Sequence, residues 1–317
     1  MDKRGVEETF KYILIAVAGA IILIFFINFA RQQIFLKEEL NSAVLSRTLN
    51  SNFDSFSVSS NADKTIDLNE DVKIRFTCGK VQVNNINPVN NENIIFSQRD
   101  IEGEKLNIWT AKWRMPFPVT NFFYVSGDTK IVIEGTDSLA KNLRGEINNV
   151  EFIPKRFVSS GDKIKRVIVV QDINQIGNGV VIYGYKDCDD LTDNYKCRGM
   201  VKFPDGEGIF IGKEMLYGAI FSDSLEDYKC DVNKAFERLT RVSDIYQEKA
   251  NTLASVCSGQ GSFGSGLMTG LSNGLNGLKN LKLENLNLND VDAKMSKIDQ
   301  LIDSNKEARG DCGIYLF

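Results

Sequence analysis

The residues best placed to bind a metal ion lie in the acidic segment DCDDLTDNYKC, residues 187–197. Four carboxylates fall within this segment, and cysteines occupy its second and last positions. Oxygen-rich loops of this kind can hold calcium, although the ordered spacing, the central glycine and the terminal glutamate of an EF-hand loop are missing. A solvated acidic loop is the simpler interpretation. The metal candidates are Asp187, Asp189, Asp190 and Asp193.

The chain contains no histidine. Histidine is the commonest general base and the commonest metal ligand, so Ser-His and Cys-His nucleophile pairs are excluded. A hydrolase would have to work with Asp and Glu carboxylates, and the aspartates of the acidic segment are its candidates. The sequence therefore favours a protein without catalytic residues and without a cofactor, and it leaves the question of an enzyme open.

Six cysteines without a C-x-x-C pair predict disulfides rather than a zinc site. The two in the acidic segment, Cys188 and Cys197, could close a short loop. Cys230 precedes one predicted helix and Cys312 follows another, so a bond between them would close an antiparallel hairpin. If these two bonds form, the remaining pair is Cys78 and Cys257. Other connectivities of the six cysteines are possible.

A glycine-rich stretch covers residues 258–277. It contains a G-x-G-x-x-G spacing but follows a predicted helix, whereas a dinucleotide-binding loop follows a strand, so a flexible connector is the simpler interpretation. Within it, glycine recurs at every fourth position and is followed each time by leucine, a spacing that permits close helix packing. These residues are candidates for contact with a membrane surface or a partner groove. They are Gly266, Leu267, Gly270, Leu271, Gly274 and Leu275.

The 19 residues between Lys11 and Arg31 are uncharged. A helix over them would be about 28 Å long, close to the hydrocarbon thickness of a bilayer. Signal-peptide cores are shorter, at about 7–15 residues, so a permanent anchor is favoured over a cleaved signal. The sequence predicts a transmembrane helix over 12–30 after a short inner tail over 1–11. The charge of the amino terminus favours an amino terminus inside.

The stretch KRGVEETF, residues 3–10, places a basic residue before Gly5 and resembles the class III leader peptides of archaeal pilins and archaellins. An apolar helix, an amphipathic extension and a β-rich head follow, in the order of the pilin plan. The resemblance covers residues 1–53 and implies a pilin-like or pseudopilin-like filament subunit. Glu7, Glu8 and Lys11 depart from the pattern, because burial of these charges in a filament core is costly without partners.

The rest of the chain predicts an α+β fold. Leu36, Leu40 and Val44 recur at four-residue spacing and indicate an amphipathic stalk over 31–52. Alternating segments such as DVKIRFTC predict a mainly β ectodomain over 65–222, with a short helix in TDSLAKNLRGEI and a hairpin turn in FPDGEG. Two apolar stripes over 230–317 predict an antiparallel helical hairpin, with coiled-coil oligomerisation as the competing interpretation.

The 42 acidic and 38 basic residues are interspersed, giving a net charge of −4 and no basic face for nucleic acid. The predicted protein is a single-pass, membrane-anchored envelope protein with its bulk outside the cytoplasm. Its expected role is non-enzymatic binding or scaffolding of envelope proteins, with a homo-oligomer through its helices as a possibility. A filament subunit is the alternative, and a cell-surface hydrolase that uses carboxylates is the second alternative.

Overall fold

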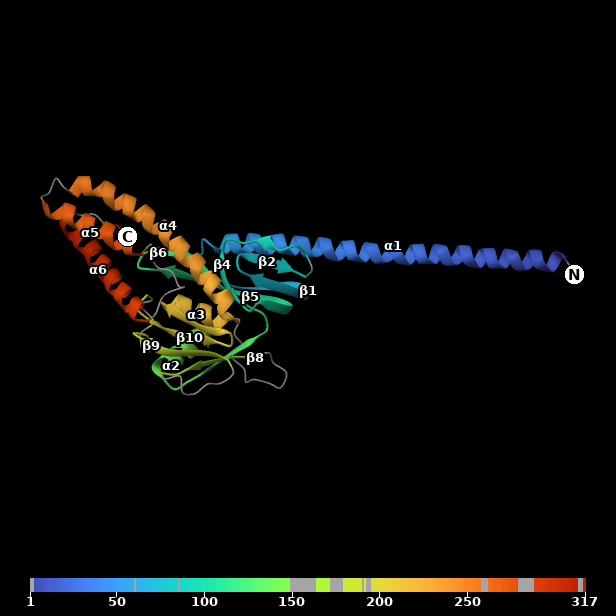
Figure 1. Ribbon diagram of the computed structural model, residues 1–317, viewed down its shortest axis with the longest axis horizontal. Coiled ribbons are helices and arrows are strands. Elements are labelled where there is room, and N and C mark those ends of the chain that lie inside the picture. Colours follow the sequence, from blue (N-terminus) through green and yellow to red (C-terminus); the bar gives the residue numbers. More distant parts are fainter. Residues whose placement is uncertain are drawn as a thin grey trace.

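The computed structural model describes residues 3–59, 61–84, 86–148, 164–171, 179–189, 191, 195–257, 262–278, 288–312 and 316–317. Two sheets, a long amino-terminal helix and a group of carboxy-terminal helices make up this part of the chain (Figure 1). The predicted α+β class is confirmed.

The first helix, α1, spans Lys3–Phe56 without a break. Its 54 residues give a length of about 81 Å. Its amino-terminal half projects away from the folded body, as does the start of its second half (Figure 1). The part that packs on the body begins near Ser42, the first of the described helix residues that is buried. The predicted stalk is therefore a direct continuation of the apolar segment and extends four residues beyond position 52.

The first sheet, sheet A, has the order β3-β2-β1-β5-β6-β4. Its neighbours are antiparallel except for β4 and β6, which are parallel. The register of β1 against β5 shifts between Asp67 and Val72. Gly79, with a φ of +68°, allows the tight turn from β1 to β2. The strands are β1 Asp63–Thr77, β2 Lys80–Val83, β3 Val89–Asn90, β4 Ile94–Ser97, β5 Asp100–Arg114 and β6 Pro118–Ser126.

The second sheet, sheet B, has the order β11-β10-β9-β8-β7. The predicted hairpin is confirmed, since β10 and β11 are antiparallel and pair Phe203 with Gly206 around the Pro204–Asp205 turn. The predicted short helix is also confirmed as α2, Ser138–Asn148, which follows β7. The strands are β7 Lys130–Glu134, β8 Ile164–Val169, β9 Val180–Lys186, β10 Arg198–Phe203 and β11 Gly206–Ile211.

Helix α3, Lys213–Phe221, packs against strands of both sheets and was not predicted. Eight of its nine residues are buried. After Lys213 and Glu214 its residues are uncharged on all sides, so the sequence KEMLYGAIF shows no helical alternation of apolar and polar faces. A Cβ at Gly218 would lie 2.8 Å from the ring of Phe96 on β4, so the absence of a side chain there permits the close approach of α3 to sheet A.

The carboxy-terminal region differs from the predicted two-helix hairpin because it contains three helices: α4 Leu225–Cys257, α5 Ser262–Leu278 and α6 Leu288–Cys312. Helix α5 occupies most of the predicted glycine-rich connector and packs against both α4 and α6. Helix α4 also begins earlier than predicted. Two side chains cap its start: the carboxylate of Asp205 accepts the backbone N–H of Leu225 at 2.8 Å, and the hydroxyl of Ser224 accepts that of Asp227 at 3.2 Å.

The two faces of sheet A are covered by different elements. On one face, Leu49 and Phe53 of α1 are fully buried in a core with Phe76, Phe123 and neighbouring strand residues. On the other face, Phe96 and Tyr124 belong to a larger core that includes α3, sheet B and the carboxy-terminal helices. The part of α1 from Ser42 to Phe56 is therefore included in the folded body, whereas the side chains of residues 17–33 are exposed.

Candidate functional site

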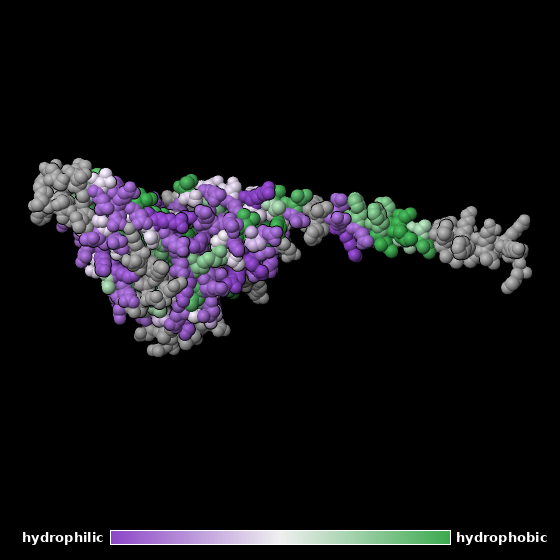
Figure 2. All heavy atoms as spheres, turned by 45° about the horizontal axis from the view of Figure 1, so that its top comes forward, coloured by the Kyte–Doolittle hydropathy of each residue, from purple (hydrophilic) through white to green (hydrophobic). Residues whose placement is uncertain are grey.

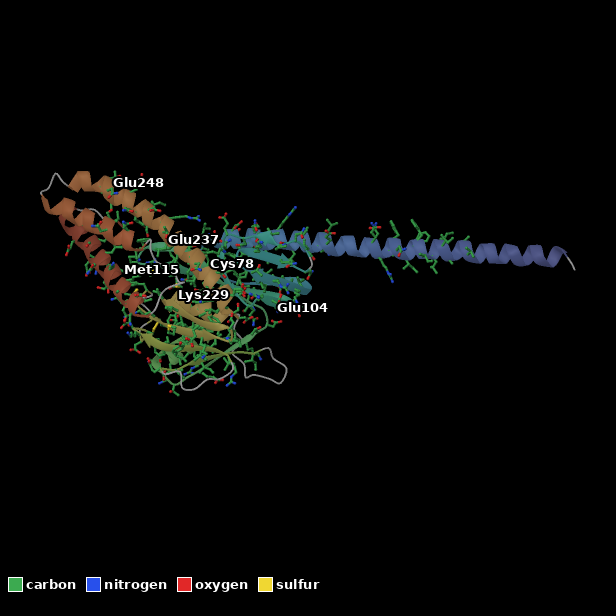
Figure 3. The ribbon with its side chains drawn as sticks, viewed as in Figure 1. Cys78, Glu104, Met115, Lys229, Glu237 and Glu248 are labelled. Carbon is green, nitrogen blue, oxygen red and sulfur yellow. A yellow bond between two sulfur atoms is a disulfide. The ribbon has the colours of Figure 1, made fainter. Side chains whose placement is uncertain are left out.

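The projecting half of α1 carries a band of exposed apolar side chains, here called the apolar band (Figure 2). Their exposed fractions range from 44% to 64%. Seven of them occupy consecutive positions from Ile21 to Ile27, so the band surrounds the helix rather than forming one stripe. Side chains stand out from this part of α1 without a neighbouring element (Figure 3). The members are Val17, Ile21, Ile22, Leu23, Ile24, Phe25, Phe26, Ile27 and Phe29.

Across the part of the chain that the structure describes, we find no helix that is both long enough and apolar enough to cross a membrane. The side chains of α1 are described at 17–33 and 39–56. The transmembrane helix over 12–30 stays a prediction.

Polar contacts also hold the packed part of α1, from Ser42 to Phe56, on the body. The side-chain amide of Asn84 donates to the Ser42 hydroxyl at 2.9 Å, and Asn91 donates to the side-chain oxygen of Asn50 at 2.8 Å. Asn93 donates to Asp54 at 3.2 Å. Together with the burial of Phe53, these contacts fix the direction in which the apolar band leaves the body.

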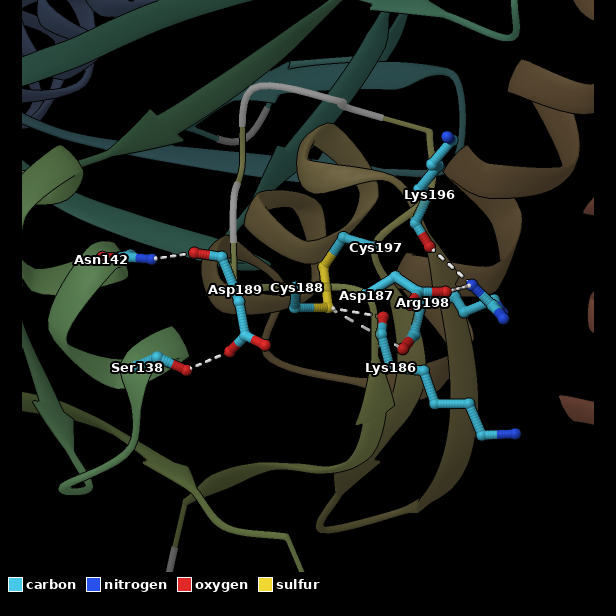
Figure 4. Close-up of a disulfide and its surroundings, with 9 residues drawn as sticks. All are labelled: Ser138, Asn142, Lys186, Asp187, Cys188, Asp189, Lys196, Cys197 and Arg198. Carbon is cyan, nitrogen blue, oxygen red and sulfur yellow. Dashed lines mark hydrogen bonds and ion pairs between the residues drawn. A yellow bond between two sulfur atoms is a disulfide. The ribbon is translucent and has the colours of Figure 1, made fainter. Parts of the chain in front are cut away.

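Two disulfides are present among the described residues. The bond between Cys188 and Cys197 is confirmed, with the two Cα atoms 4.4 Å apart (Figure 4). The second bond joins Cys78 to Cys230, so the predicted pairings of Cys230 with Cys312 and of Cys78 with Cys257 are wrong. The physical reason is that Cys230 lies inside α4, beside the β1–β2 turn, and not in front of the helix. The side chains of Cys257 and Cys312 lie outside the described residues.

The acidic segment uses its carboxylates for contacts within the protein. Asp187 forms an ion pair with Arg198. Asp189 accepts the hydroxyl of Ser138, and its backbone oxygen accepts the side-chain amide of Asn142 (Figure 4). The described residues contain no group of three possible metal ligands. The other two metal candidates, Asp190 and Asp193, lie outside the described residues.

Part of the glycine and leucine stripe packs inside the carboxy-terminal helices. Leu271 and Leu275 are fully buried, and a Cβ at Gly274 would lie 3.0 Å from Leu301 on α6. The nearest atom to a Cβ at Gly270 would be the Ser304 hydroxyl, 4.0 Å away. The surroundings of Gly266 and the side chain of Leu267 lie outside the part of the chain that the structure describes. Small residues in α5 thus allow close approach to α6.

A cavity of about 280 Å³, here called the Trp109 pocket, lies where β5, α2 and α3 meet. Aromatic side chains and charged side chains of both signs line it, and the loop after α1 contributes Asn61. The sequence analysis did not find this pocket, because its residues are separated by up to 156 positions and form no local motif. The lining residues are Asn61, Trp109, Ala111, Lys112, Arg114, Glu146, Lys213, Glu214 and Tyr217.

The two carboxylates of the Trp109 pocket have different surroundings. Glu146 accepts the hydroxyl of Tyr217 and lies 3.4 Å from the Lys213 ammonium. Burial raises the pKa of Glu214 to about 7; the nearby charge of Glu146 adds to the rise, whereas Lys213 and Arg114 oppose it. At neutral pH the pocket therefore holds one paired carboxylate and one that changes its charge near pH 7.

No known protein family, curated protein or solved structure matches this chain. The function has to be inferred from the features above.

Proposed function

We propose that the chain is a single-pass, membrane-anchored envelope protein whose folded body lies outside the cytoplasm and binds or scaffolds other proteins without catalysis. The observation that carries this proposal is the apolar band on the projecting half of α1. An exposed apolar surface that surrounds a helix is unfavourable in water, and it is favourable in lipid or against a partner. The 19 uncharged residues from 12 to 30 are long enough for one crossing.

The disulfides support the proposed side of the membrane. Such bonds persist in oxidising compartments and are rare in the cytosol. Both bonds lie in the folded body, and one of them ties the first sheet to α4. These bonds therefore support the proposal of a body outside the cytoplasm and an amino terminus inside.

Membrane fractionation of the full chain tests the anchor. We expect the protein in the membrane pellet, resistant to high salt and released by detergent. A variant with Ile22→Lys and Phe26→Lys should move to the aqueous fraction, because a lysine at the centre of a crossing costs about 3 kcal/mol. A control variant with Leu40→Lys and Val44→Lys should stay in the membrane. These two positions of α1 are nearer the body and are as exposed as Ile22 and Phe26. Wild-type protein in the aqueous fraction would contradict the proposal.

Protease protection tests the orientation separately. In sealed vesicles with the cytoplasmic face inside, added protease should remove the body and leave a short amino-terminal fragment. Protection of the body in such vesicles would contradict a location outside the cytoplasm, while leaving the anchor intact.

A second candidate function is a pilin-like or pseudopilin-like filament subunit. The observation that favours it is the division of α1, which projects as an apolar helix and then packs its carboxy-terminal part on a largely antiparallel sheet. The intact mass of membrane-purified protein separates the two candidates. Loss of residues 1–5 would support the filament subunit, and an unprocessed amino terminus would exclude it.

A further inference from the structure

The Trp109 pocket has the size of a small-molecule site. Its volume of about 280 Å³ is near the lower limit of the roughly 300–1,000 Å³ typical of ligand pockets. Its residues belong to the folded body and not to α1, so a ligand there would not depend on the membrane anchor. A molecule of about ten heavy atoms is the largest that we expect to fit.

An aromatic surface forms one wall. The ring of Trp109 lies 5.0 Å from that of Tyr217 and 4.8 Å from that of Tyr124, measured between centroids. Tyr124 is fully buried, whereas Trp109 is half-buried and lines the cavity. The indole is therefore held by its neighbours and still presents surface to the pocket, which favours a ligand with a flat or apolar ring.

Positive charge predominates among the other lining residues. Lys213 is close to the carboxylate of Glu146, as described above. Arg114 and Lys112 line the pocket from β5, and within the described residues neither forms an ion pair. Strand alternation places the side chain of Lys112 on the face of β5 opposite to Trp109, whereas the charge of Arg114, which follows a register shift, acts on Glu214 in the pocket. A cation beside an aromatic ring is suited to a carboxylate that is attached to a ring.

The charges that face Glu214 come from each element packed around it. Glu146 on α2 disfavours its ionised form, whereas Lys213 on α3 and Arg114 on β5 favour it. Tyr124 on β6 donates its hydroxyl to the backbone oxygen of Glu214 at 2.8 Å. Below pH 7 the protonated Glu214 leaves three cations and one carboxylate in the pocket, and above pH 7 a second carboxylate opposes an anionic ligand.

We propose that the Trp109 pocket binds a small ring-bearing organic anion, with its carboxylate at Arg114 and its ring against Trp109. The state of Glu214 makes this binding tighter in mildly acid solution than in alkaline solution.

Titration of the full chain in detergent with benzoate tests this inference, with benzamide as the uncharged probe of the same shape. Trp109 and Trp113 are the only tryptophans, and Trp113 is buried, so a change in intrinsic fluorescence reports on the pocket. At pH 6 we expect saturable binding of benzoate, and roughly tenfold weaker binding of benzamide because a charge-assisted contact is lost. No saturable binding of benzoate, or equal binding of both probes, would overturn the proposal.

Variants locate the site. The substitution Arg114→Met should weaken benzoate binding at least tenfold, measured by calorimetry. The control Lys105→Met removes an exposed charge from the same strand and should leave affinity unchanged. Benzoate affinity should fall from pH 6 to pH 8 in the wild type and should stay constant in Glu214→Gln. An unchanged affinity in Arg114→Met, or the same pH dependence in Glu214→Gln, would overturn the assignment. Circular dichroism confirms that each variant is folded.

Discussion

The ring of Phe53 on α1 meets the ring of Phe123 on β6 edge to face, with the ring centroids 5.4 Å apart. The ring of Phe76 on β1 also meets the Phe53 ring edge to face, with the ring centroids 6.3 Å apart. Phe53 is fully buried, so this contact joins the projecting helix to the sheet at the point where the helix ends.

Replacement of Phe53 by alanine should lower the free energy of unfolding by about 3–5 kcal/mol, because it removes a fully buried ring and leaves a cavity. Chemical unfolding in detergent measures the change. Val44→Ala, at an exposed position on the same helix, is the control and should change stability by less than about 0.5 kcal/mol. Equal effects of the two substitutions would show that α1 is not packed on sheet A.

Two glycines provide a matched pair of substitutions. Gly218→Ala places a Cβ 2.8 Å from the Phe96 ring and should destabilise the protein by about 1–3 kcal/mol through overpacking. Gly145→Ala on α2 meets no atom within 4 Å and should stabilise the protein by up to about 1 kcal/mol, because alanine is the better helix former. Thermal unfolding of both variants measures these opposite signs, and the same sign in both would contradict the packing of α3.

The two disulfides should differ in their contributions to stability. Cys78 and Cys230 are 152 positions apart, whereas Cys188 and Cys197 are nine positions apart. In the chain-entropy model the long loop contributes about 5 kcal/mol and the short loop about 3 kcal/mol. Paired Cys→Ser variants, compared by chemical unfolding, measure the difference. Non-reducing peptide mapping should recover both bonds, and a Cys230–Cys312 peptide would contradict the structure.

Two buried carboxyls should make stability depend on pH. Burial raises the pKa of Glu214 and of Asp231 to about 7, and for Asp231 the ammonium of Lys234 partly opposes the rise. Unfolded carboxyls have a pKa of about 4, so the contribution is complete below pH 4 and is lost as the pH rises through 7.

Glu214→Gln should therefore lessen the loss of stability between pH 4 and pH 7, by on the order of 3 kcal/mol. Unfolding in denaturant at pH 5 and pH 8 measures the change. Glu104→Gln removes an exposed carboxylate (Figure 3) and serves as the control, with no effect on this pH dependence. If both variants keep the wild-type pH profile, Glu214 is not the titrating group.

Local patterns predicted the elements that have a polar side and an apolar side. The alternation of Val72, Ile74 and Phe76 predicted β1. The strand is longer than this pattern, because it continues through a register shift back to Asp63. Helix α3 gave no such signal, because it is buried on nearly every side. Helix α5 was missed because glycine weakens a helix in isolation, whereas its packing against two other helices stabilises it here.

The candidate sites also differ in whether they could be predicted from the sequence. The apolar band could be predicted from the sequence, because its residues are contiguous. The Trp109 pocket could not, because Trp109, Glu146 and Glu214 are brought together only by the packing of α2 and α3 against β5. The pairing of Cys78 with Cys230 was missed for a related reason, since the two cysteines are 152 positions apart and meet only where α4 packs beside the β1–β2 turn.

The bond between Cys78 and Cys230 also determines how the chain responds to mechanical force. A pull applied to the two ends passes through the sulfur atoms and bypasses the 152-residue separation between them. Fully extended, the segment between the two cysteines would add at most about 550 Å to the length of the chain. While the bond is intact, all of sheet B and most of sheet A lie within this covalent loop, and only the segments outside it can extend under tension.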